Sequence, residues 1–212
     1  MTSTVGAPRI SQNSNSPIAV CICTFRRPAG LARLLHALDR QQFDSSPPPP
    51  VQLIVVDNSP DAEAQQQVTT WQGRWPLHCA HEPRPGISYA RNTALAAVTQ
   101  ETVFIAMIDD DEEPAERWLQ ALLNAQALSD ADIVVGPTLP VFPQGTPGWI
   151  AASGFFPKPR NHESLAELDP APPAATCNVL LRASLFSDPT LRFDPELALS
   201  GGEDKLLFQD LK

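Results

Sequence analysis

An apolar run that ends in five consecutive acidic residues constrains the fold of this 212-residue chain more than any other feature of its sequence. Residues 103–108 read VFIAMI, and residues 109–113 read DDDEE. An uninterrupted apolar run of this kind is typical of a strand buried on both faces of a sheet. Adjacent carboxylates repel one another, so a fold that gathers them at one strand end gains most when a divalent cation lies among them.

Apolar runs and helical patterns alternate along most of the chain. Residues 18–24 (IAVCICT) and 51–57 (VQLIVVD) indicate buried strands, and leucines at 31, 34, 35 and 38 follow the spacing of an amphipathic helix. We expect further strands at 77–80, 133–136 and 176–181, and further helices at 62–72, 87–98, 114–128 and after Gly202. This alternation predicts an α/β fold with a mostly parallel, doubly wound sheet flanked by helices.

Charge and composition limit the partners that we expect for the chain. A net charge of -9 without a basic run argues against nucleic-acid binding. The sequence has neither an apolar run of the roughly 18 residues that a membrane span needs nor a secretory signal. The four cysteines follow neither a zinc spacing nor a C-x-x-C redox spacing, which fits a reducing cytoplasm.

Charged and polar residues follow several of the expected strands. They are Thr24 and Arg26, then Asp57, then Arg91 beyond the loop at Gly86, and Asp109 to Asp111. Each has an ordinary structural explanation, because Asp57 can cap a turn and acidic residues before Pro114 favour a helix start. Their common position at the carboxyl edge of one sheet favours a ligand site, and we assign only Glu112 and Glu113 to the start of the next helix.

Five motifs, in order, resemble those of family 2 glycosyltransferases, the inverting enzymes of the A-type nucleotide-sugar fold. They are residues 23–28 (CTFRRP), 55–59 (VVDNS), 86–92 (GISYARN), 108–112 (IDDDE) and 202–204 (GED). The resemblance covers nearly the whole chain from Ile18 onward. Residues 1–17 are rich in Ser, Thr and Asn, and we expect them to form a disordered lead-in. The resemblance divides the rest into a nucleotide-sugar-binding α/β half (18–136) and an acceptor-side half (137–212), which is irregular and Pro-rich before the Glu-Asp helix.

The resemblance also implies roles for individual residues. Asp109 and Asp111 would form the Asp-x-Asp (DXD) metal pair for Mn²⁺ or Mg²⁺, with Asp111 as the first candidate ligand, and Asp204 would be the catalytic base. The implied donor-binding residues are Thr24, Arg26, Asp57, Arg91, Asp109 and Asp110. Trp149 and Phe155 in the Pro-rich segment, and Glu203 beside the base, are candidates for the acceptor site.

From these motifs we expect metal-dependent, inverting transfer of a sugar from a nucleotide donor, a UDP-sugar first among them, to a saccharide or lipid-linked acceptor in polysaccharide biosynthesis. We expect a cytoplasmic location, which is compatible with peripheral association at the inner face of the membrane. One alternative is a nucleotidyl- or phosphotransferase, although its typical glycine-rich phosphate loops are absent from the sequence. Another is a truncated or degenerate binding module without turnover, because family members usually continue past the Glu-Asp helix.

Overall fold

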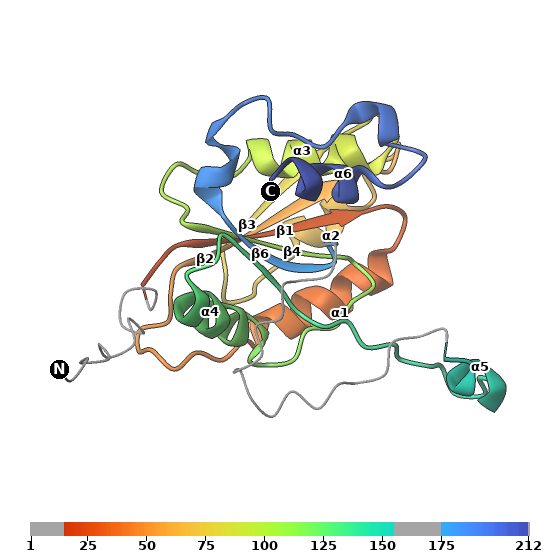
Figure 1. Cartoon of the computed structure of the whole chain (residues 1–212). Coiled ribbons are helices and arrows are strands. Elements are labelled where there is room, and N and C mark those ends of the chain that lie inside the picture. Colours follow the sequence, from red (N-terminus) through yellow and green to blue (C-terminus); the bar gives the residue numbers. More distant parts are fainter. Residues whose placement is uncertain (1–14, 155–174, 212) are drawn as a thin grey trace.

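The computed structural model of the chain describes residues 15–154 and 175–211. Most of the predicted lead-in and the acceptor candidate Phe155 therefore lie outside the described residues. Within the described part, six strands form one sheet in the order β3-β2-β1-β4-β6-β5 (Figure 1). The strands are β1 (Ile18–Thr24), β2 (Val51–Asp57), β3 (Leu77–His81), β4 (Phe104–Ile108), β5 (Ile133–Val135) and β6 (Asn178–Arg182).

The predicted, mostly parallel sheet is confirmed, with one strand reversed. β1 pairs in parallel with β2 and β4, and β2 with β3, whereas β6 runs antiparallel to both β4 and β5. The reversal has a topological cause: the chain leaves the sheet at the carboxyl end of β5 and returns at the same edge at Asn178, which lies beside Ile108 of β4. The second predicted half of the chain thus contributes a strand to the same sheet as the first.

Helices cover both faces of the sheet (Figure 1). α1 (Pro28–Asp39), α2 (Ala64–Thr69) and α4 (Trp118–Ser129) pack on one face. α3 (Ile87–Ala96), α6 (Glu203–Asp210) and the 3₁₀ turns η1 (Ala183–Ser187) and η2 (Pro195–Leu197) lie against the other. The short α5 (Gly148–Ala152) stands away from both layers.

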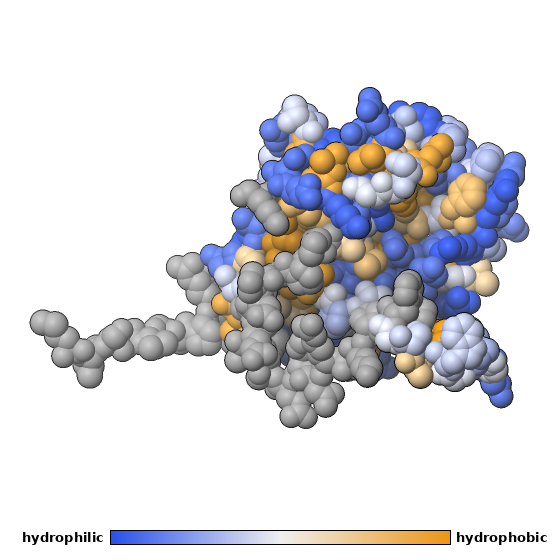
Figure 2. All heavy atoms as spheres, turned by 45° about the vertical axis from the view of Figure 1, so that its right-hand side comes forward, coloured by the Kyte–Doolittle hydropathy of each residue, from blue (hydrophilic) through white to orange (hydrophobic). Residues whose placement is uncertain are grey.

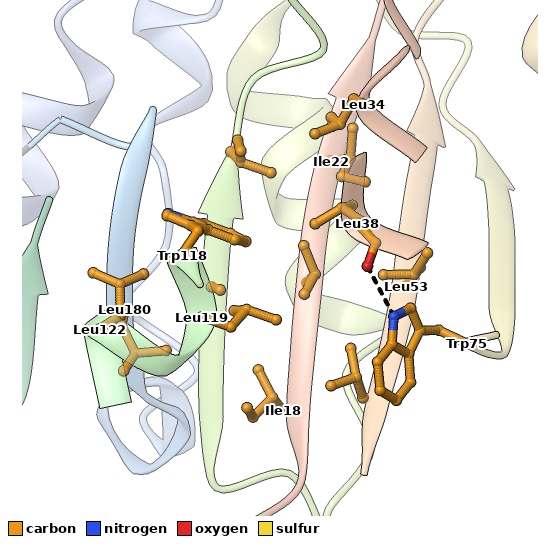
Figure 3. Close-up of a cluster of buried hydrophobic side chains, with 14 of the residues drawn as sticks. Ile18, Ile22, Leu34, Leu38, Leu53, Trp75, Trp118, Leu119, Leu122 and Leu180 are labelled. Atoms are coloured by element: carbon orange, nitrogen blue, oxygen red, sulfur yellow. Dashed lines mark hydrogen bonds between the residues drawn. The ribbon is translucent and has the colours of Figure 1, made fainter. Parts of the chain in front are cut away.

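The core follows from the alternation of side chains along each strand. Ile18, Val20 and Ile22 of β1 point into the cluster beneath α1 and α4, while Ala19 and Cys21 point toward α3. Figure 3 shows the first of these clusters, in which the indole of Trp75 donates to the carbonyl of Leu38 (3.0 Å). Each large apolar side chain buried in this way stabilises the fold by about 1.5–3 kcal/mol.

The acidic residues 112 and 113 do not start a helix, so this prediction is wrong. α4 begins at Trp118, four residues later than expected, and the chain before it forms a loop. The buried side chain of Gln41 decides where the helix begins: its amide donates to Ala115 O (2.8 Å), and its carbonyl accepts from Leu119 N (3.1 Å). Gln41 thus satisfies a backbone donor of the first turn that the helix itself leaves unpaired.

Within residues 15–154 and 175–211, no helix has the length and apolar content that crossing a bilayer requires. Hydrophilic side chains cover much of the face shown in Figure 2, and hydrophobic ones gather mainly in its upper part.

Candidate active site

The three aspartates of the loop after β4 differ in how far their side chains are buried. The side chain of Asp110 is only 6% exposed, whereas those of Asp109 and Asp111 are 43% and 58% exposed. The carboxylate of Asp110 accepts a hydrogen bond from the Thr24 hydroxyl (2.7 Å) and pairs with Arg27 (3.1 Å). Asp110 therefore anchors the loop to the end of β1, and its two neighbours remain accessible to a ligand.

Arg27, rather than Arg26, reaches the acidic loop. Arg26 has a left-handed backbone (φ 54°) and pairs loosely with the exposed Asp61 at 3.8 Å, so the donor role predicted for Arg26 stays a prediction. One Arg27 nitrogen, Nη1, contacts both Asp110 and Asp111, and Asp110 is the main cause that raises the pKa of Arg27. Sequence reasoning missed Arg27 because two adjacent arginines look alike until the backbone turn between them is known.

Gly30, in the first turn of α1, lies directly against the acidic loop. A Cβ at this position would lie 2.6 Å from the backbone oxygen of Asp110. The loop and the helix can approach this closely only because residue 30 has no side chain. The sequence pattern gave no sign of this contact, since a single glycine within a helical pattern is common.

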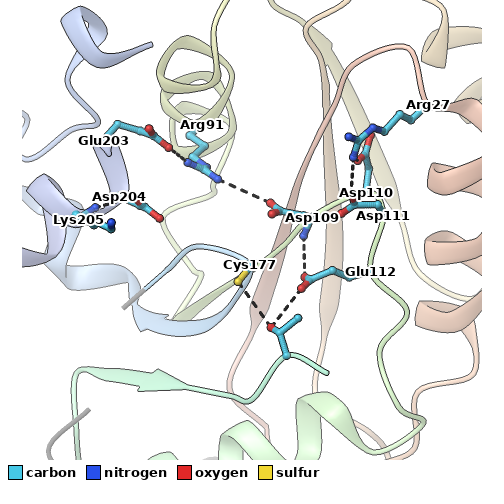
Figure 4. A network of polar contacts seen from close by, with 11 residues as sticks. Arg27, Arg91, Asp109, Asp110, Asp111, Glu112, Cys177, Glu203, Asp204 and Lys205 are labelled. Carbon is cyan, nitrogen blue, oxygen red and sulfur yellow. Dashed lines mark hydrogen bonds and ion pairs between the residues drawn. The ribbon is translucent and has the colours of Figure 1, made fainter. Parts of the chain in front are cut away.

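Arg91 of α3 joins the acidic loop to α6 (Figure 4). Its buried guanidinium forms ion pairs with Glu203 and, at 3.7 Å, with Asp109. The guanidinium also lies 5.5 Å from the centre of the Phe193 ring. Burial raises the pKa of Asp109, and the charge of Arg91 opposes this shift. The predicted donor-site residues Asp109 and Arg91 are thus brought together.

Glu203 and Asp204 are the first two residues of α6, at the end of this helix that faces the network. Glu203 is buried, and its Oε2 has no hydrogen-bond partner among the described residues. Asp204 is partly exposed, and its Oδ1 accepts from the backbone N–H of Lys205 (2.7 Å). Figure 4 shows Asp204 beside Glu203, with its carboxylate directed toward the side of Asp109.

The position of α6 depends on a close contact between η2 and α3. Gly86 has φ 130°, and a Cβ there would lie 2.5 Å from the Cβ of Ala198. The N–H of Ile87 donates to Ala198 O (3.1 Å). This contact ties the segment before α6 to the start of α3, and so brings Glu203 to Arg91.

Asp57 has a structural role at the end of β2. It is fully buried, and its two oxygens accept from the backbone N–H groups of Ser59 (2.8 Å) and Ala64 (2.6 Å). The next residue, Asn58, bonds with its side chain to the carbonyls of Glu82 and Arg84 (both 2.7 Å). Both residues shape the loop edge, and the donor contact predicted for Asp57 stays a prediction.

Glu112 folds back on the acidic loop instead of starting α4. Its Oε2 accepts from the N–H of Asp109 (3.1 Å), and its Oε1 accepts from the hydroxyl of Thr138 (3.3 Å). Burial is the main cause that raises the pKa of Glu112 to about 7. This glutamate therefore links the loop to the first residues of the segment that leaves the sheet after β5.

Trp149 is not brought to the acidic loop in this structure. It lies on α5, is 73% exposed, and belongs to a helix that stands away from the sheet (Figure 1). Its acceptor role stays a prediction. The other described acceptor candidate, Glu203, does lie in the network with Arg91.

Asp109 and Asp111 have the chemistry that Mg²⁺ or Mn²⁺ requires. Among residues 15–154 and 175–211, no group of three or more His, Cys, Asp or Glu side chains is arranged to hold a metal ion. Mg²⁺, however, is commonly held by one or two carboxylates together with phosphate oxygens of a substrate. Two accessible carboxylates at a strand end fit this coordination.

Comparison with known sequences identifies related proteins. The family model described as Glycosyl transferase family 2 matches residues 19–188. The succinoglycan biosynthesis protein ExoM of Rhizobium meliloti is 31% identical over 203 residues, which cover 92% of this chain and 61% of ExoM. The glucosyl-dolichyl phosphate glucuronosyltransferase of Haloferax volcanii is 26% identical over 146 residues, or 66% of this chain and 42% of that protein. The chain thus spans less than two thirds of either relative.

Solved structures share the fold. TarS 1-349 of S. aureus in complex with UDP-GlcNAc superposes with a TM-score of 0.60 at 18% identity, covering 91% of this chain and 52% of that one. The mannosyltransferase PcManGT of Pyrobaculum calidifontis, in complex with GDP-Man and Mn²⁺, has a TM-score of 0.62 at 18% identity, with coverage of 95% and 52%. These likenesses confirm the predicted A-type fold.

Proposed function

The chain belongs to glycosyl transferase family 2 and is a glycosyltransferase, and on this premise we propose that it transfers a sugar, with inversion, from a nucleotide-sugar donor to a saccharide or lipid-linked acceptor. The observation that carries the proposal is the network in which Arg91 joins Asp109 to the helix that bears Asp204. We propose a UDP-sugar as the first donor to test, since TarS was solved with UDP-GlcNAc. ExoM, a succinoglycan biosynthesis protein, supports a place in polysaccharide biosynthesis.

On the donor side, Asp109 and Asp111 would hold Mn²⁺ or Mg²⁺ beside the diphosphate of the donor. When bound, the cation would neutralise the negative charge that develops on the leaving nucleoside diphosphate. Arg91 adds a fixed positive charge at the same edge, and its pairs with Glu203 and Asp109 hold its guanidinium in place. Thr24, Asp57 and Arg26 at the neighbouring strand ends are the proposed contacts for the nucleotide.

On the acceptor side, we assign Asp204 as the general base. Its carboxylate is partly exposed, and Asp204 is the second residue of α6, directly after the buried Glu203. Asp204 would take the proton from an acceptor hydroxyl as that oxygen attacks the anomeric carbon from the face opposite the leaving group. Because the leaving group departs as a phosphate, it needs no general acid. Glu203 stays a proposed acceptor-site residue, because its carboxylate pairs with Arg91 in the same network.

The test is a panel of nucleotide sugars with Mn²⁺, scored by release of free nucleoside diphosphate. Asp204→Asn should retain nucleotide binding and lose transfer by about 10²-fold or more, because the general base is removed. Asp210→Asn, at the other end of α6, is the matched control and should transfer at the parent rate. Equal transfer by Asp204→Asn and the parent would remove Asp204 from the base role. Binding of a nucleotide without any product release would favour the non-catalytic binding module.

A further inference from the structure

The two ion pairs of Arg27 differ in strength. Its partner Asp110 is buried and also accepts from Thr24, so this pair is poorly screened by water. Its second partner, Asp111, is 58% exposed, and Arg27 itself is 55% exposed, although the contact is short at 2.6 Å. Exposed pairs of this kind contribute little net stability. Arg27 is therefore anchored at Asp110 and held only weakly at Asp111.

The charges of the network leave room for a divalent cation. Four carboxylates, those of Asp109, Asp110, Asp111 and Glu203, lie in ion pairs with only two guanidinium groups, those of Arg27 and Arg91. With all six groups ionised, their net charge is -2, which one divalent cation would neutralise. A cation that approaches Asp111 nevertheless meets Arg27 on the carboxylate oxygen Oδ2, and the two positive charges repel each other.

We propose that Arg27 is a positioning residue that serves as a built-in counter-cation: it holds Asp111 until a divalent cation takes this carboxylate, and it then remains paired with Asp110. The inference rests on the proposed metal role of Asp111. Arg27 orders the acidic loop in the metal-free protein, and it lowers the affinity for the metal until the ion can displace it. Removal of Arg27 should therefore tighten metal binding and loosen the metal-free loop.

The proposal predicts opposite effects of one substitution on two measurements. In Arg27→Gln, the dissociation constant for Mn²⁺ alone, followed by the spectrum of free Mn²⁺, should fall by at least about threefold, because a competing charge is gone. In buffer with a chelator, the same variant should melt at a lower temperature, because the buried Asp110 loses its charged partner. The full 212-residue chain is used throughout.

Arg40→Gln is the matched control. Arg40 is 55% exposed, as Arg27 is, and it pairs with an acidic residue of the same run, Glu113, at 3.9 Å. Its loss removes the same charge without touching the three aspartates, so the Mn²⁺ affinity should stay at the parent value. An affinity of Arg27→Gln equal to or weaker than that of Arg40→Gln overturns the proposal.

Asp111→Asn separates this inference from the proposed function. Loss of Mn²⁺ binding in Asp111→Asn, combined with no tightening in Arg27→Gln, rejects the role of Arg27 alone. Parent-like Mn²⁺ binding by Asp111→Asn, or no binding by the parent, rejects the metal assignment and the role of Arg27 with it. If Arg27→Gln fails to fold, the Arg27 guanidinium NMR signal of the parent, assigned with Arg27→Lys, decides. It should move when Mg²⁺ is added, and an unchanged signal at saturating Mg²⁺ overturns the proposal.

Discussion

Replacement of Gly30 by alanine tests whether the close contact between α1 and the acidic loop positions the site. The added Cβ would lie 2.6 Å from Asp110 O, whereas ordinary contacts begin at 3.4 Å, so helix and loop must separate by roughly 0.8 Å. Overpacking of this kind costs about 1–3 kcal/mol. The better helix propensity of alanine offsets about 1 kcal/mol of this cost, which leaves a net loss of about 1 kcal/mol in the free energy of unfolding.

The functional effect of Gly30→Ala should exceed its effect on stability. A displacement of nearly 1 Å moves Asp109 and Asp111 along with Asp110, and misplacement on this scale reduces transfer by about ten- to hundredfold. Urea unfolding gives the stability, and Mn²⁺ titration and nucleoside diphosphate release give the function. Gly148→Ala in α5 is the matched control, because a Cβ there meets nothing within 4 Å. A Gly30→Ala protein that is as stable and as active as the parent would refute the reasoning.

The remaining predictions concern hydrogen bonds and pH. Thr24→Val removes the hydroxyl that donates to the buried Asp110 and should cost about 1.5–3 kcal/mol in urea unfolding, while Thr24→Ser should recover most of this loss. The pKa of Glu112 is raised from 4.5 to about 7, so its contribution to stability is present below pH 4.5 and is lost as the pH rises through about 7. In chelator-containing buffer, the free energy of unfolding of Glu112→Gln minus that of the parent should therefore be larger at pH 8 than at pH 5. An equal difference at both pH values would contradict this. The pKa of Glu82 is lowered from 4.5 to about 2, mainly because its carboxylate accepts hydrogen bonds from Arg84. Glu82 thus stabilises the fold above pH 4.5 and loses this effect as the pH falls toward 2, and acid-unfolding curves of Glu82→Gln should lack that component.

Local patterns in the sequence were enough to predict the strands, most helices and the edge at which the site lies. Apolar runs such as 18–24 and 51–57 became β1 and β2 with the predicted bounds, because burial on both faces demands an unbroken apolar strand. The carboxyl ends of parallel strands meet at one edge, so Thr24 and Asp110 could be expected close together, and they are hydrogen-bonded. The family motifs in order also predicted the family that the comparisons show.

The tertiary structure decided which of several similar side chains takes each position. A turn at Arg26 sends Arg27 to the aspartates, and Gln41, just after α1, determines where α4 begins. The burial of Asp110 leaves Asp109 and Asp111 accessible. None of these outcomes depends on local propensity. Each depends on a contact between segments more than 70 residues apart, such as Thr24 with Asp110 or Gln41 with Leu119. Periodicity reports which face of an element is buried, but the partner across the sheet edge exists only once the chain has folded.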